Sequence, residues 1–317
     1  MKKKNGFSLI ELLIVIGIIA ILGGVMLAQF SGSTDSALSA SCMNNMRTLC
    51  NAVLATAAKQ GDYPAAGPFQ YYRKDAKGKE WRQGWIGYFG DENSCSPVSC
   101  YRDGNDDGEK QHHAITNGTI WRAMDGRESA YVCPAHTKYC KNKKKPLPSW
   151  SYAMNSYFGW DYGVAADYEV GTRSYGGGNL GFKYRKNGKN VSLSRPAERV
   201  LLFAEIPYVE VDVQLPSWDT GADTKNDMIL QYNADSARGE LGKADKAAKS
   251  SGETIGFNHK SGKDYSAHVA FADGHCVKLV MPRGISRNNL TDLTTWLCTG
   301  QEAVLVNGQY QRAEDEK

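Results

Sequence analysis

The sequence predicts an α+β protein in which one long N-terminal helix packs on a β-rich, loop-heavy globular head. Three observations predict this fold. An apolar run extends from Phe7 to Phe30 with a single charged residue, Glu11. An apolar stripe with helical spacing follows between residues 38 and 57. Beyond Pro64 the chain changes to short, aromatic-rich segments separated by turn residues, which is typical of strands.

The apolar run is long enough to cross a membrane as a helix. About 20 apolar residues span a bilayer core of roughly 30 Å, and the run covers residues 7–30. A secretory signal peptide is the alternative, but its apolar stretch would be shorter and followed by an A-x-A cleavage pattern that is missing here. Lys2, Lys3 and Lys4 predict a cytoplasmic start. We therefore expect the chain after residue 30 to be extracytoplasmic.

The continuation of this helix is amphipathic. Its stripe advances by steps of three or four residues through Leu38, Cys42, Met46, Leu49, Val53 and Ala57. Such spacing places the apolar side chains on one helix face, and the Gly- and Pro-containing stretch at residues 61–64 ends the pattern. We expect residues 31–60 to continue the membrane helix and to pack the head, residues 61–317, on this stripe.

The start of the chain also carries a processing signal. Gly6, Phe7 and Glu11, in the string KNGFSLIE, resemble the leader and cleavage site of type IV pilins and type II secretion pseudopilins. The resemblance implies that a prepilin peptidase cuts after Gly6 and that the new N-terminal Phe7 is methylated. It also implies that Glu11 pairs with the N-terminus of a neighbouring subunit, which suits a carboxylate that is costly to bury unpaired in hydrocarbon.

The resemblance implies a pilin-like fold and a structural function. Residues 1–6 would be a cleaved leader, and the mature protein would be a single-pass inner-membrane protein with a periplasmic head. An inner-membrane assembly platform would then add it to other pilin or pseudopilin subunits in a type IV pilus or a type II secretion pseudopilus. We expect no enzyme activity. The alternative is a tethered binding module whose loops 162–179 and 216–253 recognise a surface glycan or a secreted cargo.

The charge of the chain argues against a nucleic-acid partner. The formal net charge is +4, and three of these charges belong to Lys2, Lys3 and Lys4 in the leader, so the mature side chains sum to +1. A protein that neutralises phosphates carries a marked excess of positive charge, and this chain does not.

Short sequence motifs further along the chain resemble those of a pilin-like branch, of planctomycete and verrucomicrobial type, that has a C-terminal H-x9-DG segment. Here the segment comprises His259, Asp273, Gly274 and His275, with thirteen residues between His259 and Asp273. Asp273 and Gly274 lie between two strand-like runs, which predicts a tight turn beside a packed or hydrogen-bonded histidine. A metal or ligand site and acid–base catalysis are the alternatives, but no G-x-S-x-G motif supports a hydrolase.

All eight cysteines follow residue 40 and so lie on the side where disulfides persist. Local pairing of Cys95 with Cys100 and of Cys133 with Cys140 is the simplest connectivity, although sequence alone leaves others open. Residues 42 and 50 are both cysteines of the predicted amphipathic helix and lie about 12 Å apart along its axis, too far for a bridge. Each pairs with the head, pairs with another subunit or stays a thiol.

Two metal sites are suggested by spacing. Asp103, Asn105 and Asp107 match the first half of a calcium-binding EF-hand loop, whose hard oxygen ligands suit Ca²⁺. Position twelve is Ala114 instead of the usual Glu, so a solvated acidic turn competes with a calcium site. A zinc set is the second idea, drawn from Cys95, Cys100, His112, His113, Cys133, His136 and Cys140. It lacks a two-residue spacing between cysteines, and disulfides compete with it.

Overall fold

The computed structural model describes residues 9–67, 69–71, 80–82, 84–87, 100–101, 108–155, 158, 179–186, 189–211, 229–230 and 254–313. Within the first helix it leaves out the side chains of residue 11 and residues 22–34. Several predicted features lie outside the described residues: Gly6, Phe7, the side chain of Glu11, Cys95, Asp103, Asn105, Asp107 and most of the loops 162–179 and 216–253. The predictions made on them stay predictions.

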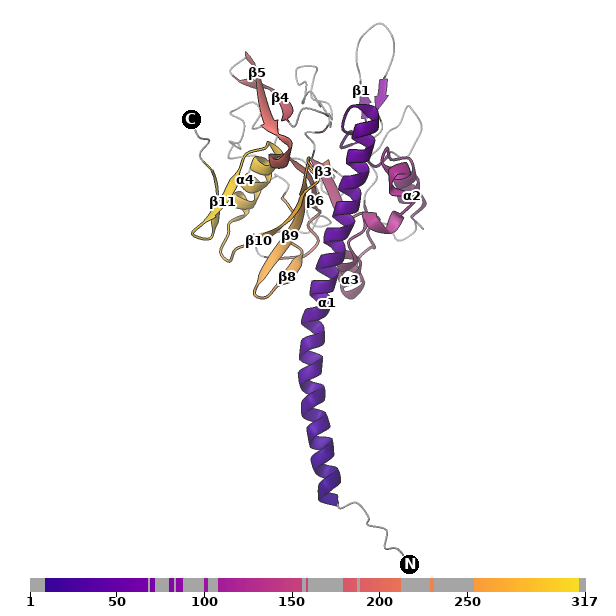
Figure 1. Ribbon diagram of the computed structural model, residues 1–317, viewed down its shortest axis with the longest axis vertical. Helices are drawn as coiled ribbons and strands as arrows, with labels where there is room; N and C mark the ends of the chain where they lie inside the picture. The colour runs from indigo at the N-terminus through magenta and orange to yellow at the C-terminus, as the bar shows by residue number, and fades with distance from the viewer. Residues whose placement is uncertain are drawn as a thin grey trace, which may run out of the picture.

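A single helix, α1 (Leu9–Gln60), forms the spine of the molecule (Figure 1). Its 52 residues span about 78 Å at 1.5 Å per residue. The N-terminal part projects away from the head, and its described large apolar side chains between Leu9 and Ile21 are 46–80% exposed. In the part of the chain that the structure describes, no helix is long and apolar enough to cross a membrane.

The C-terminal part of α1 is embedded in the head. Five members of the predicted stripe are completely buried, namely Cys42, Met46, Leu49, Val53 and Ala57. The prediction that this face packs the head is therefore confirmed. The sheet lies on one side of α1, and α2 (Glu109–Thr116) and α3 (Pro134–Lys143) lie on the other (Figure 1).

The head is built on a central sheet of six described strands with the order β10-β9-β6-β3-β7, and β8 pairs with the start of β9. These strands are β3 (Tyr152–Asn155), β6 (Leu201–Glu205), β7 (Ile229–Leu230), β8 (His259–Ser261), β9 (Asp264–Phe271) and β10 (Cys276–Met281). All pairs are antiparallel except β3 with β7. The strands β6 and β9 read as apolar runs because both of their faces are covered.

Smaller elements surround this sheet. Helix α4 (Arg287–Cys298) begins at Ser286, whose hydroxyl caps the backbone N–H of Asn289, and it is joined to β3 by the Asn155 amide, which donates to the carbonyl of Cys298. Three antiparallel ribbons complete the described strands: β1 (Phe69–Tyr71) with β2 (Glu80–Arg82), β4 (Asn179–Lys186) with β5 (Lys189–Pro196), and β11 (Ala303–Val306) with β12 (Gln309–Arg312). The short 3-10 turns with described bounds are η1 (Trp121–Met124), η2 (Glu128–Tyr131) and η4 (Ala197–Arg199).

The predicted Asp-Gly turn joins β9 to β10. Gly274 adopts φ +95°, a left-handed conformation that favours glycine. The backbone N–H of Gly274 donates to the carbonyl of Phe271, and the carboxylate of Asp273 accepts from both the backbone N–H and Nδ1 of His275, at 3.1 and 2.6 Å. The ring of His275 stacks on Phe271. The hydrogen-bond and ring-stacking contacts of Asp273 and His275 described here are therefore all local to this turn.

Candidate functional site at the junction of helix and head

The structure separates the residues of the predicted histidine segment. His259 opens β8 and pairs with Ser266 near the start of β9, whereas Asp273 and His275 follow the far end of β9. About six residues of extended strand, roughly 20 Å, lie between the two places. His259 therefore lies apart from Asp273 and His275, in a buried polar cluster beneath α1. The sequence analysis did not predict that the residues of this cluster lie together.

A disulfide joins α1 to the head at this cluster. Cys42 and Cys133 are bonded, with their Cα atoms 5.0 Å apart and 91 residues between them in sequence. The expectation that Cys133 pairs with Cys140 is thus wrong. Cys133 is the N-cap of α3 and Cys140 lies seven residues further along, about 10 Å up the helix axis, beyond the span of a disulfide. Next to the bond, the amide of Asn45 donates to the carbonyl of Val132.

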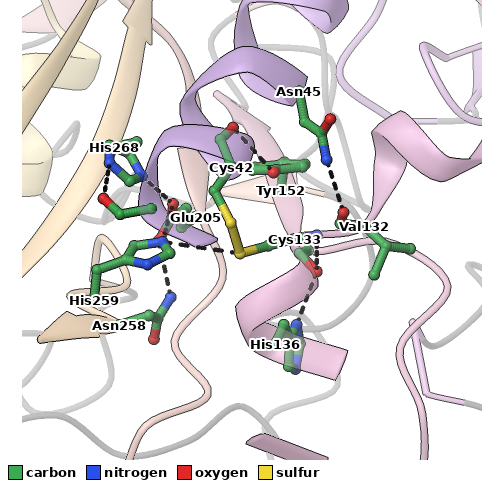
Figure 2. The surroundings of a disulfide bond; sticks show 12 residues. Cys42, Asn45, Val132, Cys133, His136, Tyr152, Glu205, Asn258, His259 and His268 are labelled. Atoms are coloured by element: carbon green, nitrogen blue, oxygen red, sulfur yellow. Dashed lines mark hydrogen bonds and ion pairs between the residues drawn. A yellow bond between two sulfur atoms is a disulfide. The ribbon is translucent and has the colours of Figure 1, made fainter. Parts of the chain in front are cut away.

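Glu205 lies at the centre of the cluster and is completely buried (Figure 2). Its Oε1 accepts hydrogen bonds from Nε2 of His259 at 2.9 Å and from Nδ1 of His268 at 2.7 Å. The amide of Asn258 donates to Oε2 at 3.3 Å. Burial alone would raise the pKa of Glu205, but the charges of His259 and His268 and the hydrogen bonds from them outweigh it and hold the pKa at about 2.

The ion pair with Glu205 also shifts the pKa of His259. Burial alone would lower the pKa of His259, and the charge and hydrogen bond of Glu205 reverse this effect, so that the pKa is raised. The two shifts agree in direction, because each group favours the charged form of the other. A carboxylate without solvent exposure is expensive unless it is paired and hydrogen-bonded, and Glu205 meets both conditions.

Sheet pairing explains why these side chains meet. Ala204 of β6 pairs with Val269 of β9, so the next residues in the register, Glu205 and His268, lie opposite each other. On the far side of β9, His268 pairs with Lys278 of β10, and Glu205 pairs with Tyr152 of β3. Directly opposed residues share a face of the sheet. The row Lys278, His268, Glu205 and Tyr152 therefore crosses the sheet beneath α1.

Residues of α1 complete this row. The hydroxyl of Tyr152 donates to the carbonyl of Cys42 at 3.2 Å, and the hydroxyl of Ser39 lies 3.0 Å from Nε2 of His268. Ser39 and Cys42 are three residues apart and so lie on the same face of the helix. The disulfide, a polar row and an apolar stripe together fix α1 on the sheet.

The residues of the predicted zinc set have other partners. His136 is buried, its Nδ1 is 2.9 Å from the hydroxyl of Ser151, and its Nε2 is 3.1 Å from the hydroxyl of Tyr101. Burial lowers the pKa of His136 to about 3, so its ring is neutral. His112 lies 3.1 Å from Glu128 on the surface. Together with the disulfide at Cys133, these contacts give His112, His136 and Cys133 partners other than a shared zinc ion.

A different group has the proximity of a metal centre but not its chemistry. The ligand atoms of Cys42, Cys133, Glu205 and His259 all lie within 4.8 Å of one another, and Sγ of Cys133 is 3.8 Å from Nε2 of His259. Thiolate is the form of cysteine that binds zinc. Because the two sulfur atoms are bonded to each other, neither is a thiolate, and the group is a covalent staple next to an ion pair.

A small pocket gives solvent a path to the edge of the cluster. It has a volume of about 170 Å³ and is lined by residues of α1, α3, β8 and the segment after β6, among them Leu38, Lys138, Tyr208 and His259. Tyr208 stacks on His136 and its hydroxyl is 3.9 Å from Sγ of Cys133. The pocket thus reaches His259, while Glu205 stays behind it.

Comparison with known proteins identifies the beginning of the chain. Residues 1–27 match the family described as the prokaryotic N-terminal methylation motif. This match supports a type IV pilin-like or pseudopilin-like protein. No curated protein and no solved structure matches the chain. The match ends at residue 27, so the likeness to the branch with the C-terminal H-x9-DG segment stays a prediction.

Sequence reasoning missed three residues of the cluster: Ser39, Glu205 and His268. A signal for two of them was present, because Glu205 and His268 are polar side chains within otherwise apolar strand runs. Such residues are buried only when they are partnered. For Ser39 there was no signal, since a serine in a helix is ordinary.

Proposed function

We propose that this chain is a prepilin-like structural subunit. It is cleaved between Gly6 and Phe7, methylated at Phe7, held in the inner membrane by the first part of α1 and then assembled into a type IV pilus or a type II secretion pseudopilus. The observation that carries the proposal is the match of residues 1–27 to the N-terminal methylation motif. The motif implies processing by a prepilin peptidase and assembly with other pilin subunits.

The exposure of the first part of α1 supports this function. The described apolar side chains between Leu9 and Ile21 are 46–80% exposed, and the head covers none of them. A continuous apolar helix surface of this length is unfavourable in water. A bilayer would cover it before assembly, and the helices of neighbouring subunits would cover it within a filament.

The junction of helix and head suits a subunit that is polymerised through its helix. Any force on α1 reaches the head through the buried stripe and through the disulfide from Cys42 to Cys133. Disulfides persist on the extracytoplasmic side of a bacterial inner membrane. The staple therefore supports a periplasmic head and a firm connection between the polymerising helix and the rest of the subunit.

Processing is tested by changing the scissile glycine. Gly6→Ala should leave the leader attached, which an immunoblot of membranes detects as a slower-migrating band. Gly17→Ala is the matched control, because a Cβ at this helical glycine meets no atom within 4 Å. Normal processing of Gly6→Ala in a host with the peptidase would contradict the proposal, as would equal defects in both variants.

Assembly is tested at the carboxylate of the apolar run. Glu11→Ala should be processed normally and should be depleted from sheared filaments, because an N-terminus in the membrane would lose its partner. Glu198→Ala, at an exposed carboxylate of η4, is the control and should assemble as the unmodified protein does. Filaments of Glu11→Ala in normal yield would remove the proposed pairing.

A further inference from the structure

Three residues from three separate elements form a continuous hydrogen-bonded line. The Oγ atom of Ser39 on α1 lies 3.0 Å from Nε2 of His268 on β9. On the other side of the same ring, Nδ1 of His268 lies 2.7 Å from Oε1 of Glu205 on β6. A hydroxyl at one imidazole nitrogen and a carboxylate at the other is the arrangement of a nucleophile, a base and the group that orients the base.

The hydrogen bond to Glu205 assigns one proton position on the ring of His268. The carboxylate of Glu205 accepts and does not donate, so Nδ1 of His268 carries the hydrogen of that bond. In the neutral form of the ring the remaining nitrogen, Nε2, has a lone pair that can accept from the hydroxyl of Ser39, 3.0 Å away. This is the tautomer in which histidine removes a proton from serine. The second histidine, His259, uses Nε2 for Glu205 and contacts no serine at that atom.

The fold holds the line rigidly. His268 is 2% exposed and Glu205 is fully buried, and both belong to paired strands. Ser39 lies one helical turn before Cys42, whose disulfide to Cys133 fixes this part of α1. Ser39 itself is half-buried, so part of the residue is exposed on the surface of α1. Rigid support of a partly exposed serine is what a reactive serine requires.

We propose that Ser39, His268 and Glu205 form an acyl-transfer site in which Ser39 is the nucleophile. In this step Oγ of Ser39 attacks the carbonyl carbon of an ester while its proton passes to Nε2 of His268. The bond to the alcohol then breaks, the alcohol takes the proton from Nε2, and the acyl group stays on Ser39. Attack by water, assisted in the same way, releases the carboxylic acid and restores the hydroxyl.

The surroundings decide the substrate class. Backbone N–H groups inside a helix are already bonded, so the N–H of Ser39 cannot stabilise a developing oxyanion as it does at a strand-to-helix turn. Lys278 pairs with His268 in the register of β9 and β10, so its side chain leaves the sheet on the same face as His268. Its positive charge also acts on His259. Without paired N–H donors, the site suits small esters with good leaving groups. His268 and Ser39 are the catalytic residues, and Glu205 is a positioning residue. This inference revises the expectation that the chain has no chemistry.

The test is labelling of the full-length protein in detergent micelles with a fluorophosphonate, which forms a bond to an activated serine and releases fluoride. Peptide mass mapping should place the label on Ser39. Ser39→Ala should lose the label, and Ser36→Ala and Ser41→Ala should keep it, since both serines lie on α1 beside the proposed nucleophile. No label, or equal labelling of the three serines, overturns the proposal.

Further variants test the roles of the partners. His268→Gln should lower the labelling rate at least about 100-fold, the usual contribution of a general base, with an unchanged rate overturning its role. Glu205→Gln should lower the labelling rate, and Glu205→Asp, which keeps a carboxylate, should recover part of that rate. A purely structural role of Glu205 would leave the two variants with equal rates.

Discussion

Removal of the disulfide between Cys42 and Cys133 should destabilise the head strongly. The bond closes a loop with a sequence separation of 91 residues. In the chain-entropy account, a loop of this length contributes about 4–5 kcal/mol to the free energy of unfolding at 25 °C. For a domain of 150–250 residues, each kcal/mol shifts the melting temperature by roughly 2–4 °C. The double variant Cys42→Ala/Cys133→Ala should therefore melt roughly 8–20 °C lower.

The assay is thermal unfolding of the full chain in detergent, followed by circular dichroism with and without a dithiol reductant. Reductant should lower the melting temperature of the unmodified protein towards that of the double variant and should leave the double variant unchanged. Cys140→Ala is the control and should respond to reductant as the unmodified protein does. A melting temperature for the double variant within about 2 °C of the unmodified protein, or a peptide map with Cys133 linked to Cys140, would refute the reasoning.

Three other predictions concern the same interface. Glu205 should contribute less to the free energy of unfolding as pH falls from its ordinary pKa of 4.5 towards about 2, and His259 should contribute less as pH rises above 6.5. The free energy of unfolding, measured at a series of pH values, should therefore have a maximum between 4.5 and 6.5, and Glu205→Gln should flatten this maximum. Gly274→Ala should lower the free energy of unfolding by at least about 1 kcal/mol, because φ is +95° and the new Cβ would approach a leucine methyl of α1 to 2.7 Å. Denaturant unfolding measures this change, and an unchanged midpoint would contradict the turn geometry. The thiols of Cys50 and Cys276 are hydrogen-bonded to each other, so mild oxidation should link them in a peptide map, and failure to link them would place them further apart than in this structure.

Periodicity predicted the parts of the fold that depend on local sequence. The stripe from Cys42 to Ala57 is buried because side chains three and four residues apart share a helix face. The turn at Gly274 was predictable for a similar reason, since only a few residue types accept its backbone conformation.

The buried cluster was not predictable in this way. Glu205 meets His259 and His268 across 54 and 63 residues, and Ser39 meets His268 across 229. These contacts depend on the order of strands in the sheet, which places β6 beside β9. The disulfide depends on it too, because local pairing of Cys133 with Cys140 was excluded only when the intervening residues proved to be a helix.

Mass spectrometry of the N-terminal peptide tests the central claim most directly. The protein should be purified from the membranes of a host that carries a prepilin peptidase and digested without prior labelling of amines. The account predicts a peptide that begins at Phe7 and carries one methyl group on its α-amino nitrogen. A peptide that still begins at Met1, or one that begins at Phe7 without the methyl group, would contradict the assignment of this chain as a processed prepilin-like subunit.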